Sequence, residues 1–163
     1  MRKLTMMFIA LFAMILVTFG QKPGNEAYNE ITSIQRILLQ ASEEVLDAEN
    51  EMALEIVHLE VDIVLGKEYK YIYRNLSKGW TYIMYAEGEN VMVRDLDMKV
   101  LKQDPITDEW YDVGEDNKEN FGAIFATKVE ETARYAIGIK VAAYEEGFSG
   151  CHYFLMIAHA RPE

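Results

Sequence analysis

Three acidic residues in the middle of the chain could together bind a metal ion. Asp95 and Asp97 lie in a segment with strand-like alternation, which places both carboxylates on one face, roughly 6.5 Å apart along the strand. Glu87 belongs to the preceding turn and could approach them from there. Calcium takes about six to eight oxygen ligands, several of them from carboxylates. Calcium is therefore the one candidate cofactor, with Glu87, Asp95 and Asp97 as ligands; alternatively, one aspartate caps the turn and the other is solvated.

The neighbouring residues Trp110 and Tyr111 are a second candidate, because they interrupt a polar and acidic segment over residues 102–120. Aromatic rings can stack on sugars or on a peptide, and binding sites often combine such rings with a few polar groups. We therefore predict that Trp110 and Tyr111 bind a ligand; the alternative is that they pin this segment onto the domain. Most of the other aromatic residues are expected in the core.

The histidines and the cysteine form no pattern that supports catalysis. None of His58, His152 and His159 lies in a Gly-x-Ser-x-Gly or His-Glu-x-x-His motif. His152 and His159 have opposite parity along one predicted strand, so they should face opposite sides of it. Cys151 has no second cysteine to pair with and sits in an apolar run, so we expect a buried, small hydrophobic side chain. The chain is predicted not to be an enzyme.

The charge of the chain excludes two classes of partner. It carries 27 acidic and 16 basic residues, for a formal net charge of −11. Nucleic-acid affinity comes mainly from Lys and Arg that neutralise phosphates, so a nucleic-acid partner is not expected. The same excess of negative charge opposes docking on anionic lipid. A protein or glycan partner remains compatible with this composition.

The first twenty residues have the layout of a secretory signal peptide. Arg2 and Lys3 form a positive start, an apolar run follows over residues 4–19, and Gly20 is a small residue at the expected cleavage point. The run is shorter than the roughly 20 residues of a membrane span. We therefore predict that residues 1–20 are removed and that the protein is exported, periplasmic or extracellular, with no stable membrane anchor. An uncleaved anchor is the alternative.

Residues 21–52 are predicted to form one long helix, over about residues 25–51, with Asn25 as its N-cap. Apolar residues recur there in steps of three and four, which is the spacing of a helical stripe. The stripe consists of Ile31, Ile34, Leu38, Ala41, Val45, Ala48 and Met52. It either packs on its own domain or forms a coiled coil between chains, through which the protein would assemble.

From residue 53 onward the apolar pattern changes to an alternation that is typical of strands. The predicted strands are residues 57–65, 69–74, 80–86, 91–101 (a strand pair or one bent strand), 121–129, 135–144 and 151–160. Residues 102–120 are predicted to be the longest loop, with a short hairpin at 110–113. The last strand is apolar on both faces and is predicted to be central. The predicted fold is all-β: a jelly-roll-like, two-sheet antiparallel sandwich over residues 53–163, preceded by one long N-terminal α-helix.

Four strand patterns then resemble the bacterial pre-peptidase C-terminal domains, a family of secreted β-sandwich modules. They are WTYIMYA (80–86), VRDLDMKVL (93–101), ARYAIGI (133–139) and GCHYFL (150–155), and they are similar to the family patterns Y-x-I-x-A, D-x-D-L-x-L, G-T-Y-x-I-x-V and G-x-Y-x-L. Ala133 stands where the family has glycine, residues 102–105 replace its glycine turn, and the long helix is not part of its pattern. The resemblance implies a jelly-roll-like sandwich with a binding or accessory role on extracellular polymers or proteins, and some members bind calcium.

Together these features predict an exported, non-catalytic binding or accessory module for an extracellular glycan or protein. The alternative is a periplasmic structural or interaction protein that assembles through its N-terminal helix.

Overall fold

The computed structural model describes residues 32–50 and 54–160. The predicted signal peptide, residues 1–20, lies outside the described residues and stays a prediction. Asn25 also lies outside them, but the described helix begins only at Ser33, so Asn25 is not its N-cap. Among the described residues, no helix has the length and apolar character that crossing a membrane requires.

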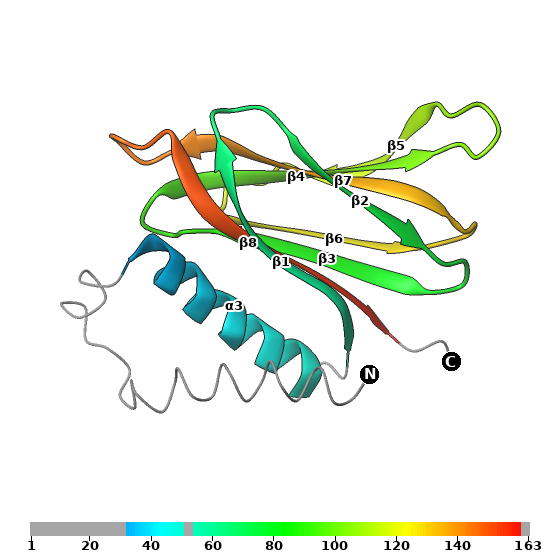
Figure 1. The fold of residues 1–163 in the computed structure, drawn as a ribbon, viewed down its shortest axis with the longest axis horizontal. Coiled ribbons are helices and arrows are strands. Elements are labelled where there is room, and N and C mark those ends of the chain that lie inside the picture. The colour runs from blue at the N-terminus through cyan, green and yellow to red at the C-terminus, as the bar shows by residue number, and fades with distance from the viewer. Residues whose placement is uncertain (1–31, 51–53, 161–163) are drawn as a thin grey trace.

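Eight strands form two four-stranded antiparallel sheets that pack face to face (Figure 1). In chain order the strands are β1 (Glu55–Leu65), β2 (Lys70–Leu76), β3 (Thr81–Gly88), β4 (Val93–Gln103), β5 (Trp110–Asp116), β6 (Gly122–Lys128), β7 (Ala133–Tyr144) and β8 (Gly150–Ala160). The first sheet has the order β1-β8-β3-β6 and the second the order β2-β7-β4-β5. Apart from β4 and β5, each strand is followed by a strand of the other sheet, as in a jelly roll. The predicted all-β, two-sheet fold with a preceding helix is therefore confirmed.

The core lies between the two sheets and is built from alternate residues of each strand. On β8, Tyr153, Leu155 and Ile157 point into this core, whereas Phe154 and Met156 point to the other face of the sheet, where the helix packs. β8 pairs with β1 on one side and with β3 on the other. Its two apolar faces are thus explained by a central position, as the sequence predicted.

The helix α3 (Ser33–Asn50) packs on the outer face of the first sheet, against β8 and β1 (Figure 1). It begins after Thr32, whose backbone N–H donates a hydrogen bond to Oε1 of Gln35 at 2.8 Å. This is the reciprocal half of a capping box, which satisfies a donor that the first turn leaves free. The buried residues of the helix are Ile37, Ala41 and Ala48.

The predicted stripe is confirmed at Ala41, Val45 and Ala48, which pack on the first sheet. The first turn differs, because Ile34 is exposed and Ile37 is buried instead. In that part of the helix Ser33, Arg36 and Gln40 bond to the carboxylates of Glu87 and Glu89. The apolar face of α3 packs on β8 and β1, which is the alternative in which the stripe packs on its own domain.

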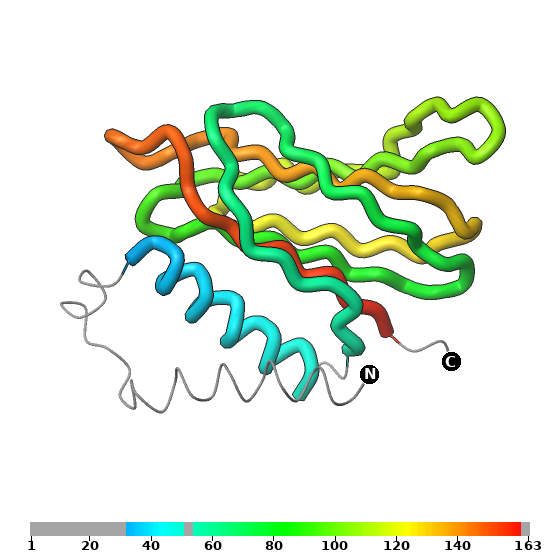
Figure 2. Tube along the Cα trace, in the orientation of Figure 1, coloured from blue at the N-terminus to red at the C-terminus, as the bar shows by residue number. Residues whose placement is uncertain are grey.

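The acidic segment that was predicted to be a loop contains a complete strand. β5 pairs with β4 from Gln103 opposite Trp110 to Met98 opposite Asp116, so the loop prediction is wrong for this stretch. β5 is an edge strand with little buried surface on either face, and it therefore lacks the apolar alternation that would have revealed it. The turn between β4 and β5 stands out at one end of the sandwich (Figure 2). β4 itself is one strand with register irregularities beside Asp95, which confirms the bent-strand alternative.

Candidate functional site

The three predicted calcium ligands do not share a site. Glu87 lies on the helix side of the first sheet, where it accepts a hydrogen bond from the Tyr85 hydroxyl at 2.5 Å. Asp97 lies on the outer face of the second sheet, and its Oδ2 is 2.6 Å from Nζ of Lys140. The sandwich core separates them, because β3 and β4 are consecutive in the chain but belong to different sheets.

Asp95, the third predicted ligand, has a separate role, since it accepts a hydrogen bond from the backbone N–H of Asn120 at 3.3 Å. Within residues 32–50 and 54–160 no group of three or more His, Cys, Asp or Glu side chains could hold a metal ion. The calcium prediction is therefore wrong for these three residues, because proximity along the chain was taken as proximity in space.

The predicted ligand-binding pair Trp110 and Tyr111 lies on β5, and the two rings point to opposite faces of the second sheet. Trp110 is opposite Gln103 and on the outer face, whereas Val113, of the same parity as Tyr111, packs on the core. Trp110 is 37% exposed and Tyr111 is 48% exposed. The Tyr111 hydroxyl donates to Oε2 of Glu109 at 3.0 Å. The structure therefore separates the pair, and only Trp110 joins other exposed rings.

These rings form a surface that we call the aromatic face, which consists of Tyr69, Tyr71, Tyr73 and Trp110 on the outer side of the second sheet. Ile72 and Leu76 of β2 are buried in the core, so Tyr71 and Tyr73 point outward. The ring centroids of Tyr69 and Tyr71 are 5.8 Å apart, and those of Tyr73 and Trp110 are 5.6 Å apart. The helix lies on the opposite side of the sandwich, and no described helix or strand covers this face (Figure 1).

Small residues on β7 allow the rings to lie close to the sheet. Tyr71 is opposite Gly138, and Tyr73 is opposite Ala136. A Cβ atom built on Gly138 would be 2.6 Å from Cε1 of Tyr71 and 3.0 Å from Cδ1 of Tyr69. Gly138 is thus required for the position of these two rings, since any side chain there would displace them.

The charged residues among the rings are mostly paired. Nζ of Lys99 is 2.5 Å from Oδ2 of Asp112, and this hydrogen bond raises the pKa of the lysine. The hydrogen bond to Asp97 likewise raises the pKa of Lys140, whose Nζ also lies 4.9 Å from the centroid of the Tyr69 ring. Both lysines therefore stay charged and neutralise their carboxylates. Glu115, opposite Lys99 on β5, adds one further carboxylate, so this part of the face has a small negative charge.

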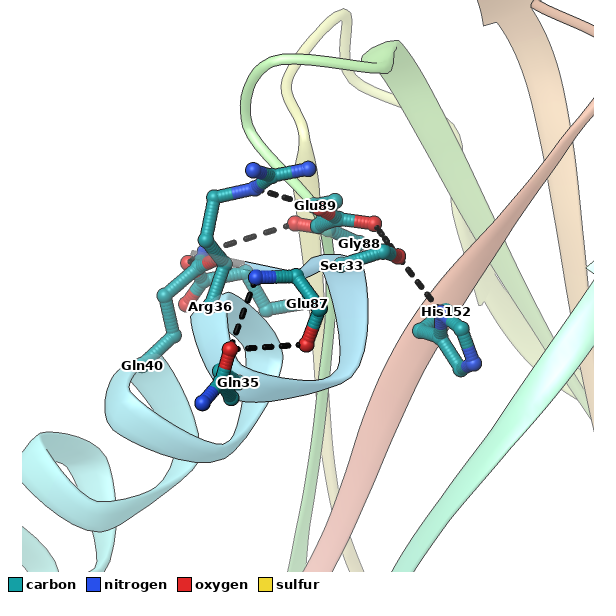
Figure 3. Close-up of polar contacts among 9 residues, drawn as sticks. Ser33, Gln35, Arg36, Gln40, Glu87, Gly88, Glu89 and His152 are labelled. Carbon is teal, nitrogen blue, oxygen red and sulfur yellow. Dashed lines mark hydrogen bonds and ion pairs between the residues drawn. The ribbon is translucent and has the colours of Figure 1, made fainter. Parts of the chain in front are cut away.

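A second polar cluster lies under the first turn of α3 (Figure 3). Glu89, in the turn after β3, is fully buried, and its Oε1 is 2.6 Å from Nε of Arg36. The Ser33 hydroxyl donates to the other carboxylate oxygen of Glu89 and lies 2.5 Å from Nδ1 of His152. Gln40 donates a hydrogen bond to Glu87. Burial, together with the hydrogen bond between Tyr85 and Glu87, raises the pKa of Tyr85.

This cluster contains a serine, a histidine and a glutamate, but their order is not that of a catalytic triad. In a triad the histidine lies between the nucleophile and the acid. Here Ser33 lies between His152 and Glu89, and the carboxylate of Glu89 is already paired with Arg36 (Figure 3). The arrangement suits a structural role, in which the first turn of α3 is tied to the β3–β4 turn and to β8.

The remaining histidines and the cysteine also occupy structural positions. His159 packs edge-on against Trp80, on the core side of β8, while His152 faces the helix, as their opposite parity predicted. Burial, with the nearby Arg74, lowers the pKa of His58. Cys151 is buried as predicted, and burial raises the pKa of its thiol to about 12.

Comparison with known proteins gives a fold likeness only. No family model and no curated protein matches the sequence. Among solved structures, the chain is similar to Aeromonas hydrophila PliG, a periplasmic lysozyme inhibitor of g-type lysozyme, at 9% identity and a TM-score of 0.46, over 67% of this chain and 90% of that one. It is also similar to the Yersinia pseudotuberculosis-derived mitogen, at 13% identity and a TM-score of 0.47, over 68% and 89% of the two chains.

A third similar structure, described as "CBM4 structure and function", has 9% identity and a TM-score of 0.38, over 70% of this chain and 83% of that one. Similarity at identities this low concerns the fold alone, so a binding site has to be argued from the residues of this chain.

Proposed function

We propose that this protein is a non-catalytic binding module and that its aromatic face binds a glycan. The observation that carries the proposal is a set of partly exposed rings on a sheet face that no described element covers. Sugar rings have apolar C–H faces, which stack on aromatic side chains, and hydroxyl groups, which need hydrogen-bond partners nearby. The aromatic face offers both kinds of group side by side.

The charge pattern supports a glycan over a strongly charged partner. Lys99 and Lys140 lie among the rings, but each is paired with a carboxylate, so they offer hydrogen bonds rather than a strong field. A sugar hydroxyl both donates and accepts, and it can therefore bond to a lysine and to its paired carboxylate at once. The chain as a whole, at −11, has little to attract polyanions.

Export and the resemblance to pre-peptidase C-terminal domains remain predictions that fit this proposal. A module that binds an extracellular glycan has to leave the cytoplasm, which is what the predicted signal peptide over residues 1–20 would achieve. A protein partner on the same face is the main competitor, and the binding experiment below separates the two.

The test uses the purified protein on a glycan array, followed by calorimetry with the best ligand. Trp110→Ala should weaken glycan binding about thirtyfold, because truncating an aromatic residue that stacks on the ligand costs about 2 kcal/mol. Tyr111→Ala is the matched control, since this ring is next in sequence and similarly exposed but faces the other way. Equal effects of the two substitutions, or no glycan bound at all, would contradict the proposal.

A further inference from the structure

One cation of the aromatic face differs from its neighbours in having no carboxylate partner. Lys99 is paired with Asp112 and Lys140 with Asp97. Arg134 on β7 is exposed, and within the described part of the chain it makes no ion pair. Arg134 lies at the end of the aromatic face next to Tyr73. In a chain with 27 acidic residues, an exposed arginine without a carboxylate partner at such a face is a departure that a ligand would explain.

The guanidinium of Arg134 lies against an aromatic ring. Its Cζ lies 4.7 Å from the centroid of the Tyr73 ring, a cation–π contact. Asn75 is opposite it on β2, and Gln103 lies on the other side, one position beyond the pair of Lys102 and Tyr135. The neighbours are therefore a ring and two uncharged amides. This leaves the planar fork of donors pre-organised for an acceptor that the described residues do not provide.

A guanidinium fork matches a carboxylate, with which it forms two parallel charge-assisted hydrogen bonds. We infer that the glycan bound by the aromatic face carries a uronic acid, whose carboxylate pairs with Arg134 while a neighbouring sugar stacks on Trp110. This inference rests on the proposed function and specifies its ligand class. Trp110 is within reach, because its ring is 5.6 Å from Tyr73, the residue on which the guanidinium lies.

The surroundings favour a glycan in which uronic acid occurs among neutral sugars, over a polyanion. Among the residues that the structure describes, only one cation of the face has no carboxylate partner, so one carboxylate of the ligand is matched. Further carboxylates would be repelled by Asp112 or Asp97. The overall charge of −11 repels a highly charged polymer, although salt screens this repulsion beyond about 8 Å. An acidic peptide would meet the same repulsion and would gain less from the rings.

The experiment is an array of uronic-acid-containing oligosaccharides with their carboxyl-reduced counterparts, probed with the full-length protein. Acidic forms should bind at least about tenfold more tightly than reduced forms, since hydrogen bonds to charged groups are worth about that factor. Arg134→Gln should remove this preference, so that acidic and reduced forms bind equally. Arg134→Lys keeps the charge but loses the planar fork, so it should retain only part of the preference for acidic forms. Lys128→Gln is the control, because it removes one exposed positive charge from the other sheet.

The outcomes separate this inference from the function on which it depends. If neutral glycans bind as tightly as acidic ones, and Trp110→Ala weakens binding but Arg134→Gln does not, the inferred uronic acid is wrong. The proposed glycan-binding function then remains supported. If no glycan binds, or Trp110→Ala has no effect, the proposed function fails as well. If a glutamate-rich peptide binds through Arg134 and no uronic acid does, the inference is overturned in favour of a protein ligand.

Discussion

The buried ion pair between Arg36 and Glu89 should be the most sensitive point in the attachment of α3. Replacing Arg36 by Met keeps an unbranched apolar chain but removes the charge that faces Glu89. The carboxylate of Glu89 is fully buried, and its other oxygen depends on the Ser33 hydroxyl. After the substitution a buried negative charge would be left without its cation, which is one of the few single changes that destabilise a domain strongly.

The size of the effect follows from the burial of the two side chains. Removing one partner of a buried pair costs about 3–5 kcal/mol. The Arg36 side chain is 12% exposed, so water compensates in part and we expect the lower end, about 3 kcal/mol. For a domain of this size each kcal/mol lowers the melting temperature by roughly 2–4 °C. Arg36→Met should therefore lower it by about 10 °C.

Thermal and urea unfolding of three variants measures this effect. Arg36→Met combined with Glu89→Gln should recover more than about 1 kcal/mol of the loss, because no uncompensated charge remains. Arg94→Gln is the control: Arg94 pairs with Glu119 at 3.8 Å, but 60% of its side chain is exposed, so its loss should change stability by less than about 0.5 kcal/mol. If Arg36→Met is as mild as the control, Glu89 is not the buried anchor of the helix.

Three further predictions concern single residues. Because burial raises the pKa of the Cys151 thiol to about 12, a thiol reagent at pH 8 should label the native protein far more slowly than the urea-unfolded protein; fast native labelling would contradict this burial. Burial, followed by the nearby Arg74, lowers the pKa of His58, so the unfolded state takes up a proton first as pH falls below about 6.5, and unfolding free energy should fall from pH 7 to pH 5. His58→Gln should flatten that part of the stability profile, and an unchanged slope would exclude His58 as its source. Gly138→Ala should weaken glycan binding by displacing Tyr71 with little change in melting temperature, whereas unchanged affinity would show that this ring does not contact the ligand.

Strands with strong alternation could be predicted from the sequence, and the weakly patterned one could not. Residues 57–65, 135–144 and 151–160 correspond closely to β1, β7 and β8, because in each of them one face or both faces must be apolar to build the core. β5 was predicted only as a short hairpin at 110–113 within a loop, because an edge strand with few buried residues leaves little apolar signal. Its hydrogen bonds to β4 are made by backbone groups, which are the same in every sequence and therefore leave no pattern of residue types.

The candidate site shows the same division. Alternation places Tyr69, Tyr71 and Tyr73 on one face of a strand, but most aromatic residues other than Trp110 and Tyr111 were expected in the core. That expectation is wrong for these three, because Ile72 and Leu76 form the core face of the strand. The pairing of Tyr73 with Trp110 joins β2 and β5, which are separated in their sheet by two other strands. The contact between Ser33 and His152, 119 residues apart, was likewise beyond any local pattern.

The sequence by itself determined the class of the fold, the central place of the last strand and the burial of Cys151, because each depends on apolar residues recurring at a period that the local backbone imposes. Only the tertiary structure decided which acidic residues meet. Consecutive strands of a jelly roll pass from one sheet to the other, so neighbours in the chain, such as Glu87 and Asp97, end on opposite sides of the core. The same crossing brings rings from distant strands onto one face, where their position decides what the protein can bind.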